Sequence, residues 1–155
     1  MILVNSINLV GLEMNQIEKY QKEVQENIAS LGGDTALWES TVSWIVQANA
    51  HRYTYNFNWQ GRPIIQYPQD IVAVQELIWQ IKPDLIIETG IAHGGSLIFS
   101  ASMLALLDMC DAIETGATLN PKESKRKVLG IDIDIRAHNR TAIEAPLCHS
   151  SCPLV

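Results

Sequence analysis

The residues best placed to do chemistry form a glycine-rich stretch between a short apolar run and a helical pattern. The stretch reads Glu88-Thr-Gly-Ile-Ala-His-Gly-Gly-Ser96. Glycines at a strand-to-helix turn let a ligand approach the backbone, because no Cβ is in the way. The start of a helix adds unpaired N–H groups and the positive end of the helix dipole. Gly90, Gly94 and Gly95 therefore predict a binding turn for a small molecule.

An acidic residue follows the next predicted strand. Asp132 comes directly after the apolar run that ends at Ile131. In a parallel sheet, ligands bind beyond the carboxyl ends of the strands, and an acid there can hold the two hydroxyls of a ribose. Together, the glycine turn and Asp132 predict a site for a cofactor that contains a nucleoside.

The type of cofactor depends on Glu88. The spacing Gly90-x-Ala92-x-x-Gly95 is a degenerate dinucleotide fingerprint, but the position of Glu88 is usually apolar in dinucleotide folds. A carboxylate there repels a pyrophosphate and suits the ammonium group of S-adenosylmethionine (SAM). The spacing from Glu88 to Gly90 and Gly94 also matches the first motif of Rossmann-like methyltransferases. SAM is favoured, while a dinucleotide and a purely structural turn remain as alternatives.

Several residues near the turn have two interpretations. His93 touches cofactor or substrate, or it fixes the turn through backbone hydrogen bonds. Ser96 binds the cofactor or caps the following helix. Asp134 is a second ribose contact or, as we favour, a helix cap. No catalytic and no metal-binding residue is predicted, and the expected cofactor-binding residues are Glu88, Gly90, Ala92, His93, Gly94, Gly95, Ser96 and Asp132.

Three blocks, in this order, resemble the cephalosporin hydroxylase family, which includes rhamnosyl O-methyltransferases. They are Trp59-Gln-Gly-Arg-Pro-Ile-Ile-Gln-Tyr-Pro-Gln-Asp70, Lys82-Pro-Asp-Leu-Ile-Ile-Glu-Thr-Gly-Ile-Ala-His-Gly-Gly-Ser-Leu97 and Gly130-Ile-Asp-Ile-Asp-Ile-Arg-Ala-His-Asn-Arg140. The resemblance runs from about Tyr53 to Glu144. It implies a Rossmann-like fold, SAM binding at the glycine turn and Asp132, and O-methylation of a hydroxyl on a small metabolite or sugar. It also implies Mg²⁺, which orients the acceptor hydroxyl.

The sequence departs from the family pattern after Glu144. In the family, the metal-binding acids come from later strands, whereas this chain continues as Ala145-Pro-Leu-Cys-His-Ser-Ser-Cys-Pro-Leu-Val155. We therefore expect a C-terminally truncated chain that lacks the Mg²⁺ ligands and transfers no methyl group by itself. A non-catalytic Rossmann fragment or oligomer partner is the alternative, and an NAD(P)-binding oxidoreductase is a weaker one.

Hydrophobic periodicity predicts the elements that carry this turn. We expect Met1–Gly11 to be a strand or an unpacked arm. The expected helices are Met14–Leu31, Asp34–Ala50 (capped by Asp34), Asp70–Ile81 (capped by Asp70), Leu97–Leu107 and Ile135–Ala145, and the expected strands are Leu85–Ile87, buried and parallel, and Val128–Ile131. The predicted fold class is α/β, an incomplete Rossmann-like class I methyltransferase fold with N-terminal helices and the first β-α-β unit. The predicted divisions are a helical segment (1–50), the N-terminal half of a SAM-binding domain (51–145) and an atypical tail (146–155).

Other polar and aromatic residues have simpler explanations. We expect His51–Asp70 to be partly extended and partly loop, with its aromatic residues in packing. By the family resemblance, Gln66 and Asp70 also approach the cofactor. The segment His138–Arg140 is predicted to lie at the surface or in salt bridges, while the family resemblance favours a structural role near the site. Lys122–Lys127 is predicted to form a solvated loop after an irregular segment that starts at Asp108. We interpret Cys148-His149-x-x-Cys152 as an incidental part of the tail, not a metal site.

Composition limits the partners. The 155 residues are 47% apolar and carry a formal net charge of −6, which disfavours nucleic acid and anionic membranes. Three cysteines are too few for a disulfide scaffold and favour a reducing, cytoplasmic location. No run approaches the roughly 20 apolar residues of a membrane span. We expect a small-molecule substrate and consider a homo-oligomer possible.

Overall fold

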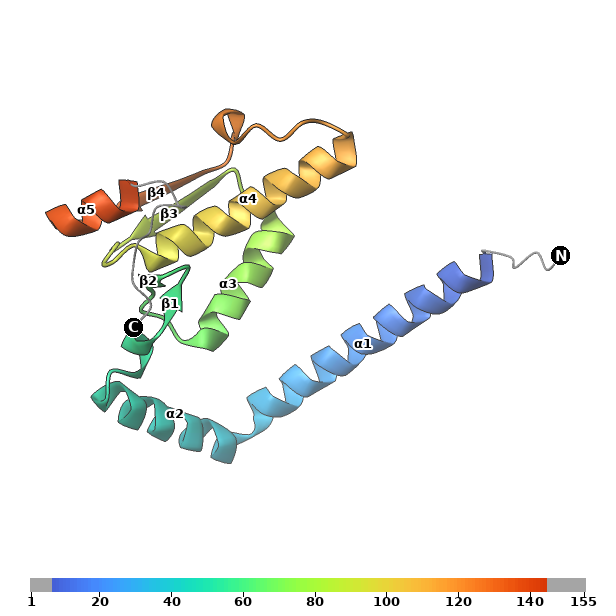
Figure 1. The fold of residues 1–155 in the computed structure, drawn as a ribbon. Coiled ribbons are helices and arrows are strands. Elements are labelled where there is room, and N and C mark those ends of the chain that lie inside the picture. The colour runs from blue at the N-terminus through green and yellow to red at the C-terminus, as the bar shows by residue number, and fades with distance from the viewer. Residues whose placement is uncertain (1–6, 145–155) are drawn as a thin grey trace. The chain divides into compact units, whose positions relative to one another are not determined.

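The computed structural model describes the backbone of residues 7–144; side chains are described from Asn15 onwards, except that of Ala142. The chain divides into two compact units, Met1–Ala50 and His51–Val155, and each is described by itself (Figure 1). The segments 1–6 and 145–155 lie outside the description, so the predicted tail and the Cys148-His149-x-x-Cys152 motif do as well.

The first unit contains two helices, α1 (Ile7–Gly33) and α2 (Thr35–Ala50). The predicted cap is confirmed, because Asp34 Oδ1 accepts a hydrogen bond from the backbone N–H of Leu37 at 2.9 Å. The prediction of a strand or arm over Met1–Gly11 is wrong for residues 7–11, which already belong to α1. Helix α1 therefore begins at Ile7, seven residues before the predicted start at Met14.

The first unit buries none of its described side chains. The predicted apolar stripe of α1 exists, but four of its five side chains are exposed and only Val24 is partly buried, with Tyr20 66% exposed. Helix α2 is also largely exposed, and its Trp38 is 66% exposed as well. This unit is helical without having a core of its own.

The second unit begins with a short 3₁₀ helix, η1 (Tyr53–Asn56), and an antiparallel hairpin of β1 (Asn58–Trp59) and β2 (Arg62–Pro63). The mixed extended and loop character predicted for this stretch is therefore confirmed. Helix α3 follows at Pro68–Ile81. Asp70 is not its cap, because proline at the first helical position starts the helix two residues earlier.

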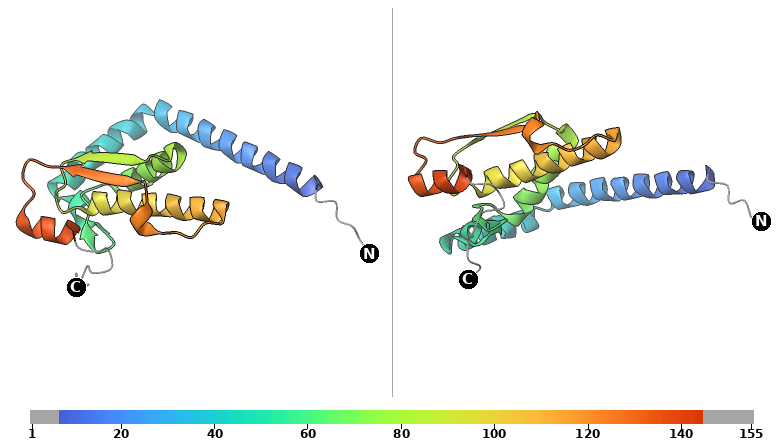
Figure 2. Two further views of the ribbon diagram at one scale, coloured as in Figure 1. Left: turned by 90° about the horizontal axis from the view of Figure 1, so that it is seen from above. Right: turned by 45° about the horizontal axis from the view of Figure 1, so that its top comes forward.

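A parallel pair of strands forms the centre of the second unit. Strand β3 (Leu85–Thr89) pairs with β4 (Lys127–Ile131), and the register places Glu88 beside Gly130. Helix α4 (Gly95–Thr115) connects them and packs along one face of the pair, as Figure 2 shows. Helix α5 (Ala137–Glu144) follows β4. The described unit is a mixed α/β structure that is compatible with part of a Rossmann-like fold.

Helix α4 is longer than predicted. Asp108–Thr115 is helical, not irregular, and the short 3₁₀ helix η2 (Pro121–Glu123) comes only after Gly116. Among the described residues, α4 is also the one helix that is long and apolar enough to cross a membrane. The expectation that no segment approaches the length of a membrane span is therefore wrong when judged by length and composition. A core helix passes the same test. Phe99, Leu104 and Leu107 of α4 belong to the core, although only 33% of the apolar window is buried.

The core of the second unit lies between α3, α4 and one face of the strands. Its buried members are Ile64, Ile78, Phe99, Leu104 and Leu107. The other face of the strands is open among the described residues, with Leu85, Ile87, Leu129 and Ile131 between 48% and 58% exposed. The predicted strand and its parallel pairing are confirmed, but β3 is covered on one face only.

The loop predicted to be solvated contains a partly buried ion pair. Arg126 Nη1 lies 2.6 Å from Asp108 Oδ1 and 2.8 Å from Asp111 Oδ2, and the Arg126 side chain is only 11% exposed. Ser124 Oγ also donates to Asp108 Oδ2 at 2.5 Å. The prediction fails at Arg126 because the longer α4 brings two carboxylates to this loop.

Candidate functional site

A cavity of about 320 Å³ opens where the predicted glycine turn leaves β3. This volume is at the lower end of the range of small-molecule sites. Its lining comes from four places in the sequence: the segment after β2, the first half of α3, the end of β3 with its turn, and the first turns of α4. Of the predicted cofactor residues, Glu88, Gly90, Ala92, His93, Gly95 and Ser96 line it, whereas Gly94 and Asp132 do not.

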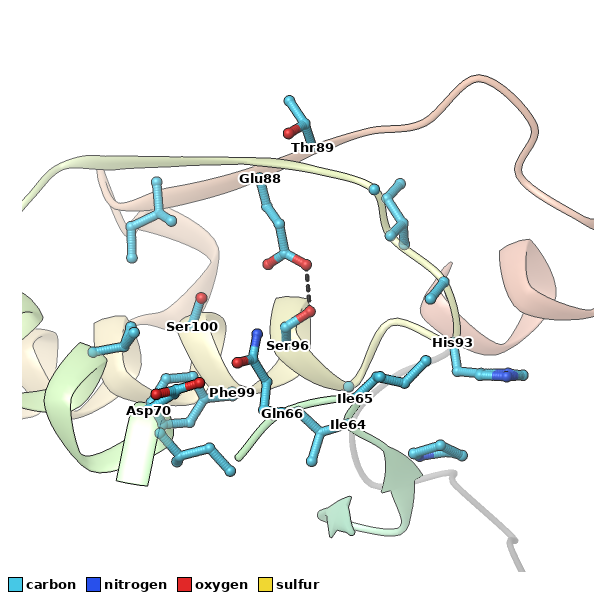
Figure 3. A pocket seen from close by; sticks show the side chains of 18 of the residues that line it. Ile64, Ile65, Gln66, Asp70, Glu88, Thr89, His93, Ser96, Phe99 and Ser100 are labelled. Carbon is cyan, nitrogen blue, oxygen red and sulfur yellow. Dashed lines mark hydrogen bonds between the residues drawn. The ribbon is translucent and has the colours of Figure 1, made fainter. Parts of the chain in front are cut away.

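Glu88 supplies a carboxylate to this cavity. Its half-buried side chain points from β3 toward the start of α4, where Ser96 Oγ donates a hydrogen bond to Glu88 Oε1, while Thr89 points the other way (Figure 3). Burial raises the pKa of the Glu88 carboxyl, and the hydrogen bond from Ser96 offsets part of that rise. A cation in the cavity would stabilise the ionised carboxylate, so this site favours a positively charged ligand group.

The glycines of the turn serve different purposes. Gly90 (φ +83°) and Gly94 (φ +79°) have left-handed backbones, which side chains rarely adopt. At Gly95, a Cβ would lie 2.2 Å from the carbonyl oxygen of Pro63 and 2.8 Å from Cα of Ile64. Gly95 therefore allows the hairpin segment to pack directly against the first turn of α4, and this contact forms one wall of the cavity.

Asp132 ties the end of β4 to the glycine turn. Its Oδ2 accepts from the backbone N–H of Ile91 at 2.7 Å, and its Oδ1 accepts from that of Asp134 at 3.1 Å. Backbone hydrogen bonds, with Asp134 and Ile91 as the largest contributors, lower the pKa of Asp132. A carboxylate has about four acceptor positions, so Asp132 can bind the turn and still accept from two ribose hydroxyls.

Asn139 departs from its predicted surface position and has a structural role beside the turn, which the family resemblance favoured. It is buried, not at the surface, and its Nδ2 donates to the carbonyl oxygen of Ala92 at 2.7 Å. Ala92 itself has a left-handed backbone with φ +46°. Asn139 lies four residues before Ile143 on α5 and four residues after Ile135, which precedes the helix. Residues four apart share one face of a helix, so this spacing could have predicted that Asn139 faces inward with these apolar residues.

The remaining candidates divide between the site and the packing around it. His93 is exposed at the rim of the cavity, and Gln66 and Asp70 also line it (Figure 3). The approach of Gln66 and Asp70 to a cofactor, which the family resemblance implied, stays a prediction. Trp59 is in packing, as predicted: its ring contacts Phe99 at a centroid distance of 4.9 Å. Asp134 is not a helix cap, because α5 begins only at Ala137.

Within the described part of the chain, no group of three or more His, Cys, Asp or Glu side chains is gathered to hold a metal ion. The Mg²⁺ ion that the resemblance implies therefore has no assigned ligands among these residues.

The described unit is a mixed α/β structure with a glycine turn after one strand and an acid after the next, and it is compatible with part of a Rossmann-like fold. Comparison with models of known protein families identifies the family to which this fold belongs. The chain belongs to the family described as rhamnosyl O-methyltransferase/CmcI, whose family model matches residues 51–154. No curated protein and no solved structure gives a match.

The matched range begins where the second unit begins, at His51. The whole described site therefore belongs to the family region, and helices α1 and α2 lie outside it. The match also takes in most of the segment 146–155, which the sequence prediction sets apart from the family. The family indicates a function of the O-methyltransferase type, which uses SAM.

Proposed function

We propose that the second unit binds SAM at the glycine turn, as part of an O-methyltransferase that acts on a hydroxyl of a small metabolite or sugar. The observation that carries the proposal is the half-buried carboxylate of Glu88, which faces a cavity of about 320 Å³ beside the N-terminus of α4. In this arrangement Glu88 receives the ammonium group of the methionine part, directly or through water. SAM supplies the methyl group, and the chain's own residues bind and orient it.

Asp132 takes the ribose in this proposal. Its position after β4 is one strand away from Glu88, and its hydrogen bond to Ile91 keeps it beside the turn. The backbone N–H groups at the start of α4 remain for the carboxylate of the methionine part. The Ser96 hydroxyl already donates its proton to Glu88 and holds that side chain in place. A dinucleotide is less well suited, because Glu88 and the other carboxylate on the cavity wall, Asp70, would both repel its pyrophosphate.

Isothermal titration calorimetry on the 155-residue chain tests this proposal. We expect SAM and S-adenosylhomocysteine to bind, and NAD not to bind. Glu88→Gln should weaken both SAM and S-adenosylhomocysteine by about 10- to 100-fold, the range for a lost hydrogen bond to a charged group. The binding of 5′-methylthioadenosine, which has no ammonium group, should not change.

The matched control is Glu76→Gln, which removes the same charge from an exposed position on α3 that does not line the cavity. Wild-type affinity for SAM should fall as the pH drops through the raised pKa of Glu88, because the protonated carboxyl no longer attracts the ammonium. NAD binding tighter than SAM, or unchanged SAM binding by Glu88→Gln, would overturn the proposal. Methyl transfer by the 155-residue chain alone would contradict the prediction that it is inactive by itself.

The alternative of a non-catalytic oligomer partner draws support from the open face of β3 and β4 and from the exposed helices of the first unit. A chain that binds neither SAM nor S-adenosylhomocysteine but associates in solution would favour it.

A further inference from the structure

Helix α1 presents an apolar stripe that is unpartnered in its own unit. The stripe consists of Ile17, Tyr20, Val24, Ile28 and Leu31; four of these side chains are 57–66% exposed, and Val24 is partly buried. Helices α1 and α2 diverge from the corner at Gly33 and Asp34, so α2 does not cover the stripe (Figure 1). Since most helix stability comes from packing an apolar face, this helix requires a partner.

The stripe is symmetric about its centre. Tyr20 and Ile28 lie four residues on either side of Val24, and Ile17 and Leu31 lie seven residues on either side. On an α-helix all of them point within about 40° of the direction of Val24. The spacing of the apolar residues is therefore the same in both directions from Val24. When a second copy of the helix lies antiparallel to the first, each apolar residue of one stripe faces an apolar residue of the other.

The flanks of the stripe permit this self-pairing. Gln21 and Asn27 lie three residues on either side of Val24, so their amides border the stripe. In the antiparallel pair, Gln21 lies opposite Asn27 of the partner subunit, and two amides can hydrogen-bond to each other. No like charges meet along the stripe.

Four of the five charged residues from Glu18 to Glu26 form ion pairs within the helix, and all five point away from the stripe. Lys19 Nζ lies 4.0 Å from Glu23 Oε1, and Lys22 Nζ lies 3.7 Å from Glu26 Oε1. All four side chains are more than half exposed. Each charged residue from Glu18 to Glu26 points at least about 100° away from the direction of Val24. The polar face therefore stays in water when the stripe is covered.

We propose that α1 is a dimerisation helix whose partner is α1 of a second copy of this chain, antiparallel, with Val24 on the twofold axis. In such an isologous contact Val24 meets its own counterpart. Tyr20 packs against Ile28 of the partner subunit, and Ile17 packs against Leu31 of the partner subunit. The proposal concerns a surface outside the family region and does not depend on the cofactor site.

Sedimentation velocity of the full chain over a range of concentrations tests for the dimer. Val24→Glu should raise the dimer dissociation constant by at least about tenfold, because the axis brings two like charges together. Ala29→Glu adds the same charge on the exposed face of the same helix and should leave the dimer intact. A mixture of Val24→Glu and Val24→Lys chains should recover association as a heterodimer.

Cysteine cross-linking tests the direction of the pair, with the unsubstituted chain as background for its own cysteines. A mixture of Ile17→Cys and Leu31→Cys chains should form a disulfide heterodimer, whereas Ile17→Cys alone should not cross-link above background. A chain that is monomeric at all concentrations, or a dimer that Val24→Glu does not weaken, would overturn the proposal. Self-cross-linking of Ile17→Cys would show a parallel pair and overturn the antiparallel arrangement.

Discussion

The two units of this chain use similar apolar content in opposite ways. Residues 15–50 form helices with no buried side chain, whereas the unit from His51 onwards gathers Ile64, Phe99, Leu104 and Leu107 in a core. The difference lies in what the apolar residues can meet. In the second unit, hairpin, helices and strands converge on α4, while in the first unit α1 and α2 diverge from Gly33. The first unit should therefore tolerate substitutions that the second does not.

The largest expected effect separates the two units directly. Phe99→Ala should lower the free energy of unfolding by about 3–5 kcal/mol, the usual cost of removing a core aromatic side chain. Val46→Ala on α2, where the side chain is 65% exposed, should change it by less than about 0.5 kcal/mol. Urea unfolding followed by far-ultraviolet circular dichroism measures both, because helices of both units contribute to that signal. Equal effects would abolish the distinction.

Glycine substitutions extend the comparison to the backbone. Gly95→Ala forces a Cβ to within 2.2 Å of the Pro63 carbonyl oxygen and should cost about 2–3 kcal/mol, with loss of SAM binding. Gly33→Ala at the end of α1 has nothing within 4 Å of the added Cβ and should leave stability unchanged. Thermal unfolding followed by circular dichroism is the measurement. A Gly95→Ala protein as stable as the wild type would mean that the hairpin is not seated against α4.

Ion pairs should also differ between the units. Burial raises the pKa of Asp108, but hydrogen bonds from Ser124 and Arg126, with the charges of Arg126 and Lys127, outweigh burial and lower it overall. Asp108→Asn should therefore cost about 1.5 kcal/mol at pH 7. Glu26→Gln, which removes an exposed partner of Lys22, should cost less than about 0.5 kcal/mol.

The pH dependence sharpens the Asp108 prediction. Because its folded pKa lies below the ordinary value of 3.8, its contribution to stability is complete above that pH and is lost as the pH falls through the folded pKa. The difference between wild type and Asp108→Asn should shrink below about pH 4 in urea titrations. A difference that stays constant down to pH 2 would contradict the assigned role.

The smallest expected effect concerns Asn139. Asn139→Ala removes the hydrogen bond to the Ala92 carbonyl and should cost about 1 kcal/mol, with SAM binding weakened several-fold because the turn loses its support. His138→Ala, at an exposed neighbouring position, is the control. If both variants bind SAM as the wild type does, the turn keeps its shape without α5.

Local patterns predicted much of the fold. The helical stripes of α1 and α2, the Asp34 cap, the parallel strands and the glycine turn follow from spacing within single segments, and the structure contains each of them. The errors lie where distant segments meet. Arg126 was predicted to be solvated because its partners, Asp108 and Asp111, were placed in a loop, and Asn139 was placed at the surface because its acceptor lies 47 residues earlier in the chain.

The sequence by itself determined the elements, the family region and the residue types of the candidate site, because propensity, capping and glycine spacing act over a few residues. Only the tertiary structure placed the Glu88 carboxylate against Ser96 in a cavity, attached Asp132 to Ile91, and seated Gly95 under Pro63. The physical reason is that burial, the resulting pKa shift and steric contact depend on which segments come together. The same reason explains why the stripe of α1, so regular in sequence, has no partner within its own unit.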